Sequence, residues 1–76
     1  MTDYEFIEDL RERSNKSPTG GLRLTRPERE RLYRGGKQHI RLMNKDLIYL
    51  DRDWLGRMLA AFESCLSRAV VDKLLK

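Results

Sequence analysis

The sequence predicts a small α+β domain that is mainly helical, with a long amphipathic C-terminal helix and a short β-hairpin. Apolar residues recur at steps of three and four along residues 51–76, the period of a helix with one apolar face. Helix-capping residues stand near positions 2 and 25. Apolar and polar residues alternate in residues 22–24 and in parts of residues 37–50, as in a strand. An all-α fold of three to four helices is the alternative.

The chain has 76 residues, the size of one domain with a small core. Its single cysteine, Cys65, cannot close an internal disulfide, and Cys65 and His39 are too few ligands for a structural metal. We therefore expect oligomerisation to supply stability. The acidic N-terminal segment lacks the apolar stretch of a signal peptide, and no apolar run is long enough to cross a membrane. These features, with the lone cysteine, predict a cytoplasmic protein.

The C-terminal helix is predicted over residues 51–76, with Asp51 as its N-cap and Asp53 in its first turn. Its apolar stripe consists of Trp54, Leu55, Met58, Leu59, Phe62, Cys65, Leu66, Ala69, Val70 and Leu74. The helix is longer than the rest of so short a chain can cover, so we expect part of the stripe to contact a second copy or another protein. The residues predicted for this contact are Trp54, Leu55, Met58, Phe62, Leu66 and Val70.

A first helix is predicted from Thr2 or Asp3 to about Arg13, with acids in its first turns and arginines in its last. Residues 14–21 are rich in turn formers and contain no apolar side chain. We therefore expect this segment to be a flexible loop without anchors.

Residues 22–24 are predicted to form a short strand. Thr25 and Glu28 then have the spacing of a capping box, with Pro27 in the first turn. The helix that follows should run to about Arg34, with Leu32 as its main apolar residue, and end at residues 35–36, which are both glycine.

Residues 37–50 fit two structures. In a hairpin with its turn at residues 44–45, Leu42 faces Leu47 and Ile40 faces Tyr49. In a helix, apolar residues at positions 40, 43, 47, 50 and 54 share one face. The hairpin is preferred, because a strand can lead directly into a capped helix at Asp51, whereas a helix leaves no room for a loop.

Positive charge is concentrated in the middle of the chain. Residues 16–45 carry nine bases and two acids, a net charge of +7, whereas residues 1–15 carry two bases and five acids, a net charge of −3. Such a segment is typical of proteins that contact phosphates. The residues predicted to bind nucleic acid, or an acidic protein partner, are Arg23, Arg26, Arg29, Arg34, Lys37, Arg41 and Lys45.

No group of residues indicates an enzyme, a cofactor or a small-molecule substrate. His39 has no cysteine or acid at a catalytic spacing, and Cys65 is expected to be a small core residue. Asp51 and Asp53 are explained by the start of a helix. The glycines at 35–36 match no phosphate-binding motif and are expected to end a helix.

The sequence therefore predicts a small non-enzymatic regulator, a dimer that binds nucleic acid through residues 23–45. DNA binding and transcription regulation are its expected roles. The alternative is a viral or plasmid accessory protein that inhibits or adapts a host regulatory protein by protein–protein interaction. The sequence leaves open whether the basic segment meets DNA, RNA or an acidic protein surface.

Overall fold

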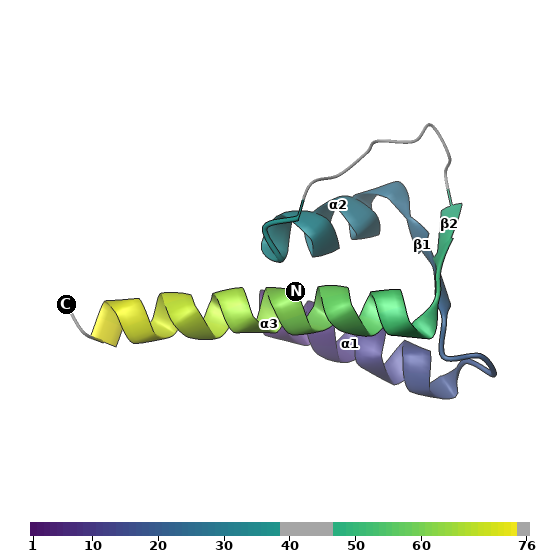
Figure 1. The fold of residues 1–76 in the computed structure, drawn as a ribbon, viewed down its shortest axis with the longest axis horizontal. Helices are drawn as coiled ribbons and strands as arrows, with labels where there is room; N and C mark the ends of the chain where they lie inside the picture. Colours follow the sequence, from purple (N-terminus) through teal and green to yellow (C-terminus); the bar gives the residue numbers. More distant parts are fainter. Residues whose placement is uncertain (39–46, 75–76) are drawn as a thin grey trace.

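The computed structural model describes residues 1–38 and 47–74. Its elements, in chain order, are α1 (Asp3–Lys16), β1 (Leu22–Thr25), α2 (Arg26–Gly35), β2 (Leu47–Leu50) and α3 (Arg52–Leu74) (Figure 1). The predicted class, a mainly helical α+β domain with a long C-terminal helix, is confirmed. α1 and α2 lie along the first half of α3, and the two strands lie at the end where α3 begins (Figure 1). α1 runs antiparallel to α3, whereas α2 runs in the same direction as α3.

Each helix begins at a capping residue that the sequence predicts. Thr2 and Glu5 form a capping box at α1, in which the hydroxyl accepts from the Glu5 amide and the carboxylate accepts from the Thr2 amide. Thr25 and Glu28 do the same at α2. The carboxylate of Asp51 accepts a hydrogen bond at 2.7 Å from the amide three residues further along, in the first turn of α3. Local sequence chemistry therefore explains where the helices start.

α1 is longer than predicted, and the loop that follows it is correspondingly shorter. The helix continues to Lys16 instead of ending near Arg13, so the predicted loop over residues 14–21 is reduced to residues 17–21. The Ser14 hydroxyl donates to the carbonyl of Gly20 at 2.6 Å, and the hydroxyls of Thr19 and Tyr49 lie 2.9 Å apart. The expectation that this loop lacks anchors is therefore wrong, because Ser14 of α1 and Tyr49 of β2 both bond to it, whereas its flexibility stays a prediction.

The sheet consists of β1 and β2 in antiparallel pairing, with Leu22 opposite Leu50 and Leu24 opposite Ile48. The strand predicted at residues 22–24 is confirmed, but its pairing with β2 was not predicted. The first strand and the turn of the predicted hairpin lie in residues 39–46, outside the described part of the chain. The alternative of one helix through residues 37–50 is wrong, because residues 47–50 are extended.

A single apolar core lies between the three helices and the inner face of the sheet. Its buried side chains are Phe6, Ile7, Leu10, Leu24, Leu32, Leu50, Leu55, Met58, Leu59 and Phe62. Every described element contributes to this set, and α3 contributes the largest share, four of the ten residues. Burial of these side chains is the main force that holds α1 and α2 against α3.

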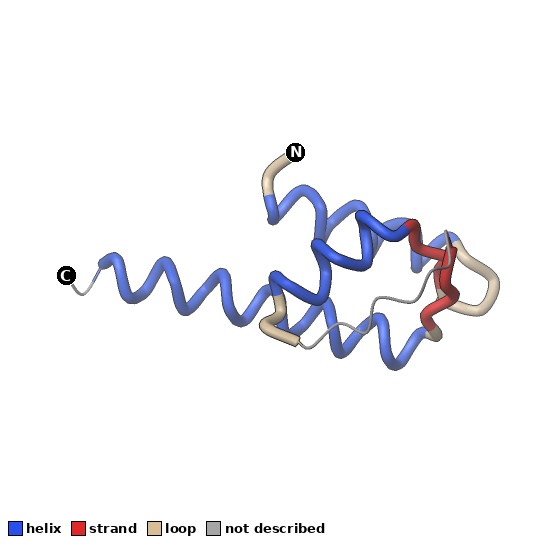
Figure 2. The backbone as a smooth tube through the Cα atoms, turned by 90° about the horizontal axis from the view of Figure 1, so that it is seen from above, coloured by secondary structure: helices blue, strands red, loops and turns tan. Residues whose placement is uncertain are grey.

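The second half of α3 extends past the ends of α1 and α2 (Figure 2). Leu66 is partly buried against the core, but Val70 is 48% exposed and Leu74 is 80% exposed. Three residues predicted to contact a partner, Leu55, Met58 and Phe62, are instead buried in the core. Of the predicted contact set, only Leu66, Val70 and the exposed Trp54 are accessible to a partner, and self-association remains a prediction.

Candidate nucleic-acid interface

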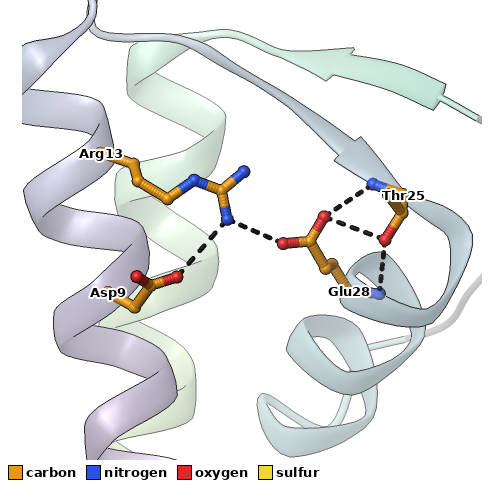
Figure 3. A network of polar contacts seen from close by, with 4 residues as sticks. All are labelled: Asp9, Arg13, Thr25 and Glu28. Atoms are coloured by element: carbon orange, nitrogen blue, oxygen red, sulfur yellow. Dashed lines mark hydrogen bonds and ion pairs between the residues drawn. The ribbon is translucent and has the colours of Figure 1, made fainter.

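The orientation of α2 is set by a polar network that joins it to α1 (Figure 3). Arg13 of α1 donates to the carboxylate of Glu28 at 2.7 Å and also reaches Asp9 at 3.4 Å. The same Glu28 carboxylate accepts from the amide and the hydroxyl of Thr25, each at 2.9 Å. The capping box of α2 is therefore also its tie to α1.

This network changes the ionisation of both partners. Partial burial opposes the charged form of Glu28, but hydrogen bonds from Arg13 and Thr25 outweigh burial and lower the pKa of its carboxyl below the ordinary value of 4.5. The hydrogen bond to Glu28 raises the pKa of Arg13. Both groups are charged at neutral pH, and their ion pair adds to the contacts that hold α2 beside α1.

Arg31 is a second tie between the helices. Its guanidinium donates to Asp3 at 2.9 Å and to the carbonyl of Met1 at 3.0 Å, and it lies 4.7 Å from the centre of the Phe6 ring. An arginine held by a carboxylate, a carbonyl and an aromatic face contributes to stability rather than to an open phosphate site.

Arg29 does not lie where the sequence prediction placed it. Arg29 was predicted to bind nucleic acid or an acidic partner, which requires an exposed side chain, but Arg29 is only 5% exposed. The reason is its position one turn before Leu32, on the side of α2 that packs inward. Arg29 is therefore removed from the candidate interface.

Four other predicted basic residues are exposed. Arg23 lies on β1, Arg26 and Arg34 lie near opposite ends of α2, and Lys37 follows α2. Arg26 forms an ion pair with Glu30 at 3.3 Å. Arg23, Arg34 and Lys37 form no ion pair with the part of the chain that the structure describes, so they are available to phosphate oxygens. The remaining predicted residues, Arg41 and Lys45, lie outside the described residues.

The outer face of the sheet adds residues that sequence reasoning did not assign. Arg23 is directly opposite Tyr49, and Thr25 is directly opposite Leu47. All four residues are exposed, because they alternate with the inward-facing leucines and isoleucine of the two strands. The alternation in residues 47–50 was a signal for the exposure of Tyr49, but its pairing with Arg23 is non-local and left no local signal.

Two aromatic residues also meet beside α2. The indole N–H of Trp54, in the first turn of α3, donates to the hydroxyl of Tyr33 on α2 at 2.7 Å. Trp54 remains 42% exposed. This bond joins the first turn of α3 to the last turn of α2. Trp54 therefore connects the two helices and is also partly exposed.

Within residues 1–38 and 47–74, no helix is long and apolar enough to cross a membrane. In the same residues, no cluster of three histidine, cysteine or acidic side chains is placed to hold a metal ion. No protein family, curated protein or solved structure matches this chain.

Proposed function

We propose that this protein is a small non-enzymatic regulator that binds nucleic acid, with Arg23, Arg26, Arg34 and Lys37 as its phosphate contacts. The observation that carries the proposal is that three of these four exposed side chains have no acidic partner among the described residues. The other described bases of the central segment are engaged differently. Lys16 pairs with Glu12 and Arg31 with Asp3, while Arg29 is buried.

Phosphate contacts of this kind supply affinity but little base preference. Arg26 and Arg34 are eight residues apart on one helix, a rise of about 12 Å, so both can follow one backbone. Arg34 and Lys37 lie close in sequence at the end of α2, where their positive charges are also favoured by the helix dipole. Arg34 and Lys37 form no ion pair within the described residues, whereas Arg26 shares its charge with Glu30.

The second candidate is a protein-binding inhibitor or adaptor. It is favoured by Leu47, which is 52% exposed on the outer face of the sheet, the face that also carries Arg23. An exposed apolar side chain on the same face as an arginine suits an acidic protein surface with an apolar centre. Nucleic acid is preferred because the exposed bases extend along α2, well beyond this small apolar area.

The test is fluorescence anisotropy with a labelled generic duplex of about 30 base pairs, which spans roughly three helical turns. Four phosphate contacts predict a slope of log K against log salt near −3.6, since each contact contributes about −0.9. Arg34→Glu should weaken binding strongly and flatten the slope. Lys16→Glu makes the same change in net charge at the end of α1 and should have a much smaller effect.

Lys37 needs a substitution that respects its backbone, because its φ is 57°. Lys37→Asn suits this left-handed conformation and removes one charge. The slope of log K against log salt should therefore become less negative by about 0.9, the value for one contact. Absence of binding by the wild-type protein at low salt would overturn the proposal, and the protein-binding alternative would then lead.

A further inference from the structure

One end of the molecule combines an exposed aromatic ring with two arginines and a polar cavity. The loop of residues 17–21, the outer face of the sheet and the start of α3 all lie at this end (Figures 1 and 2). The side chains concerned are Arg23 on β1, Tyr49 on β2, Thr19 in the loop and Arg52 in the first turn of α3.

Tyr49 is held in place while its ring stays accessible. Its hydroxyl lies 2.9 Å from that of Thr19, and its ring end packs so closely on Gly21 that a Cβ at that position would overlap it. The side chain is nevertheless 50% exposed. A ring fixed at its polar tip loses little conformational freedom on binding, which favours its use as a stacking surface.

Two arginines lie at the same end of the molecule as this ring. Arg23 is the direct cross-strand neighbour of Tyr49. Arg52 lies against Gly20, where an added Cβ would come 2.9 Å from its Cδ, so it borders the loop that carries Thr19. Neither arginine forms an ion pair with any residue in the described ranges.

A polar cavity of about 320 Å³ adjoins the ring through Thr19. It is lined by Ser14, Asn15, Ser17, Pro18, Thr19, Gly20 and Arg52. The lining of this cavity is mainly polar, with hydroxyl groups and one guanidinium. Such a lining suits a phosphate or a sugar rather than an apolar ligand.

We infer that this end of the molecule is a binding site for single-stranded nucleic acid, in which an unpaired base stacks on Tyr49 and the adjoining phosphates contact Arg23 and Arg52. The inference rests on the proposed function and specifies its preferred substrate. Aromatic side chains flanked by basic residues are the usual means of binding single strands, because every base has a face that can stack. Bases within a duplex are already stacked, so a duplex can use only the phosphate contacts.

The experiment measures anisotropy with short labelled oligo-dT, oligo-U and a duplex of matched length. Tyr49→Leu removes the ring but keeps an apolar side chain at this position. It should weaken binding to the single strands about tenfold, within the range for loss of one stacking contact, and leave duplex binding unchanged. Tyr49→Phe keeps the ring and should retain most of the affinity. The dT and U arms compare single-stranded DNA with single-stranded RNA, which here differ in the ribose 2′-hydroxyl and in the 5-methyl group of the base.

Tyr4→Leu is the matched control, because Tyr4 is 49% exposed and lies on α1. It should not change binding to any of the three probes. Arg52→Gln should reduce the salt slope for single strands by about 0.7, the value for one phosphate contact. Arg68→Gln, on the same helix but in its exposed second half, should not. Thermal unfolding of each variant checks that the fold is kept.

Failure of the two proposals can be told apart. If no probe binds at low salt, the proposed function itself fails, and this inference fails with it. If the duplex and single strands bind equally well and Tyr49→Leu changes neither, phosphate binding stands but the stacking site is overturned. Selective loss of single-strand affinity in Tyr49→Leu, with Tyr4→Leu unaffected, supports the site.

Discussion

The guanidinium of Arg13 in α1 lies 2.7 Å from the carboxylate of Glu28 in α2, and that carboxylate also caps its own helix through Thr25 (Figure 3). One side chain therefore both starts α2 and fixes it to α1. Burial against the common core brings α1 and α2 together. The ion pair then favours the arrangement in which Arg13 faces the start of α2.

Glu28→Gln should lower the free energy of unfolding by about 1 kcal/mol at neutral pH, the usual effect of weakening a cap and a partly exposed ion pair. The folded-state pKa of Glu28 is lowered from 4.5. Its charge therefore stabilises the fold fully above about pH 4.5, and this contribution is lost as the pH falls through the lowered pKa. Urea unfolding across this range should show the difference between wild type and variant closing in acid.

Glu12→Gln is the control for this pH series. Its partner Lys16 is on the same helix and both side chains are largely exposed, so little change is expected at any pH. A deficit in Glu28→Gln that stayed constant well below pH 4 would show that its charge is not the cause.

Gly35→Ala should destabilise the protein by about 1–3 kcal/mol, because a Cβ at this position would overlap the buried ring of Phe62. Gly56→Ala is the matched change within α3. Its Cβ would meet nothing within 4 Å, so it should stabilise the helix by up to about 1 kcal/mol. Thermal melts should move in opposite directions, and a Gly35→Ala protein as stable as wild type would contradict the close packing of α2 on α3.

Arg31→Gln should lower stability by about 1 kcal/mol, because it removes the contacts with Asp3 and the Phe6 ring. Arg34→Gln removes an equal charge from the same helix and should change stability by less than about 0.5 kcal/mol. In nucleic-acid binding the order should be reversed: Arg34→Gln should lose more affinity than Arg31→Gln. Equal unfolding free energies would show that Arg31 is not a tie between the helices.

Self-association through the exposed half of α3 should be broken by Val70→Glu without loss of the fold. The reason is that Val70 is half exposed, so a charge there disrupts a helix–helix contact but no core packing. Phe62→Asp would instead unfold the protein, because Phe62 is buried. Sedimentation equilibrium of both wild type and Val70→Glu at about 100 µM, above the range of weak dimers, decides the matter. A monomeric wild-type protein at that concentration removes the prediction.

Much of the fold was predictable because its signals are local. The capping residues Thr2, Thr25 and Asp51 each act within one helical turn, so the starts of the helices could be read directly. The apolar period of α3 similarly predicted its buried side, from Leu55 to Phe62. The end of α1 was less predictable, because Ser14 is held by a contact with Gly20 across the loop.

The candidate site was only partly predictable, because exposure depends on packing between elements. Charge density marked the central segment as basic, but it did not distinguish the buried Arg29 and the paired Arg31 from the exposed Arg34. Tyr49 and Arg52 were not assigned to the site at all. They reach it through contacts with Thr19 and Gly20, about 30 residues away in sequence.

The helix starts, the apolar faces and the excess of positive charge could be read from the sequence, since each depends on residues within a turn or two of one another. The pairing of residues 47–50 with β1, the burial of Arg29, the ion pair of Arg31 and the place of Tyr49 beside Arg23 could be found only from the tertiary structure. Those outcomes depend on packing α1, α2 and α3 around one core, which brings together residues that no local pattern connects.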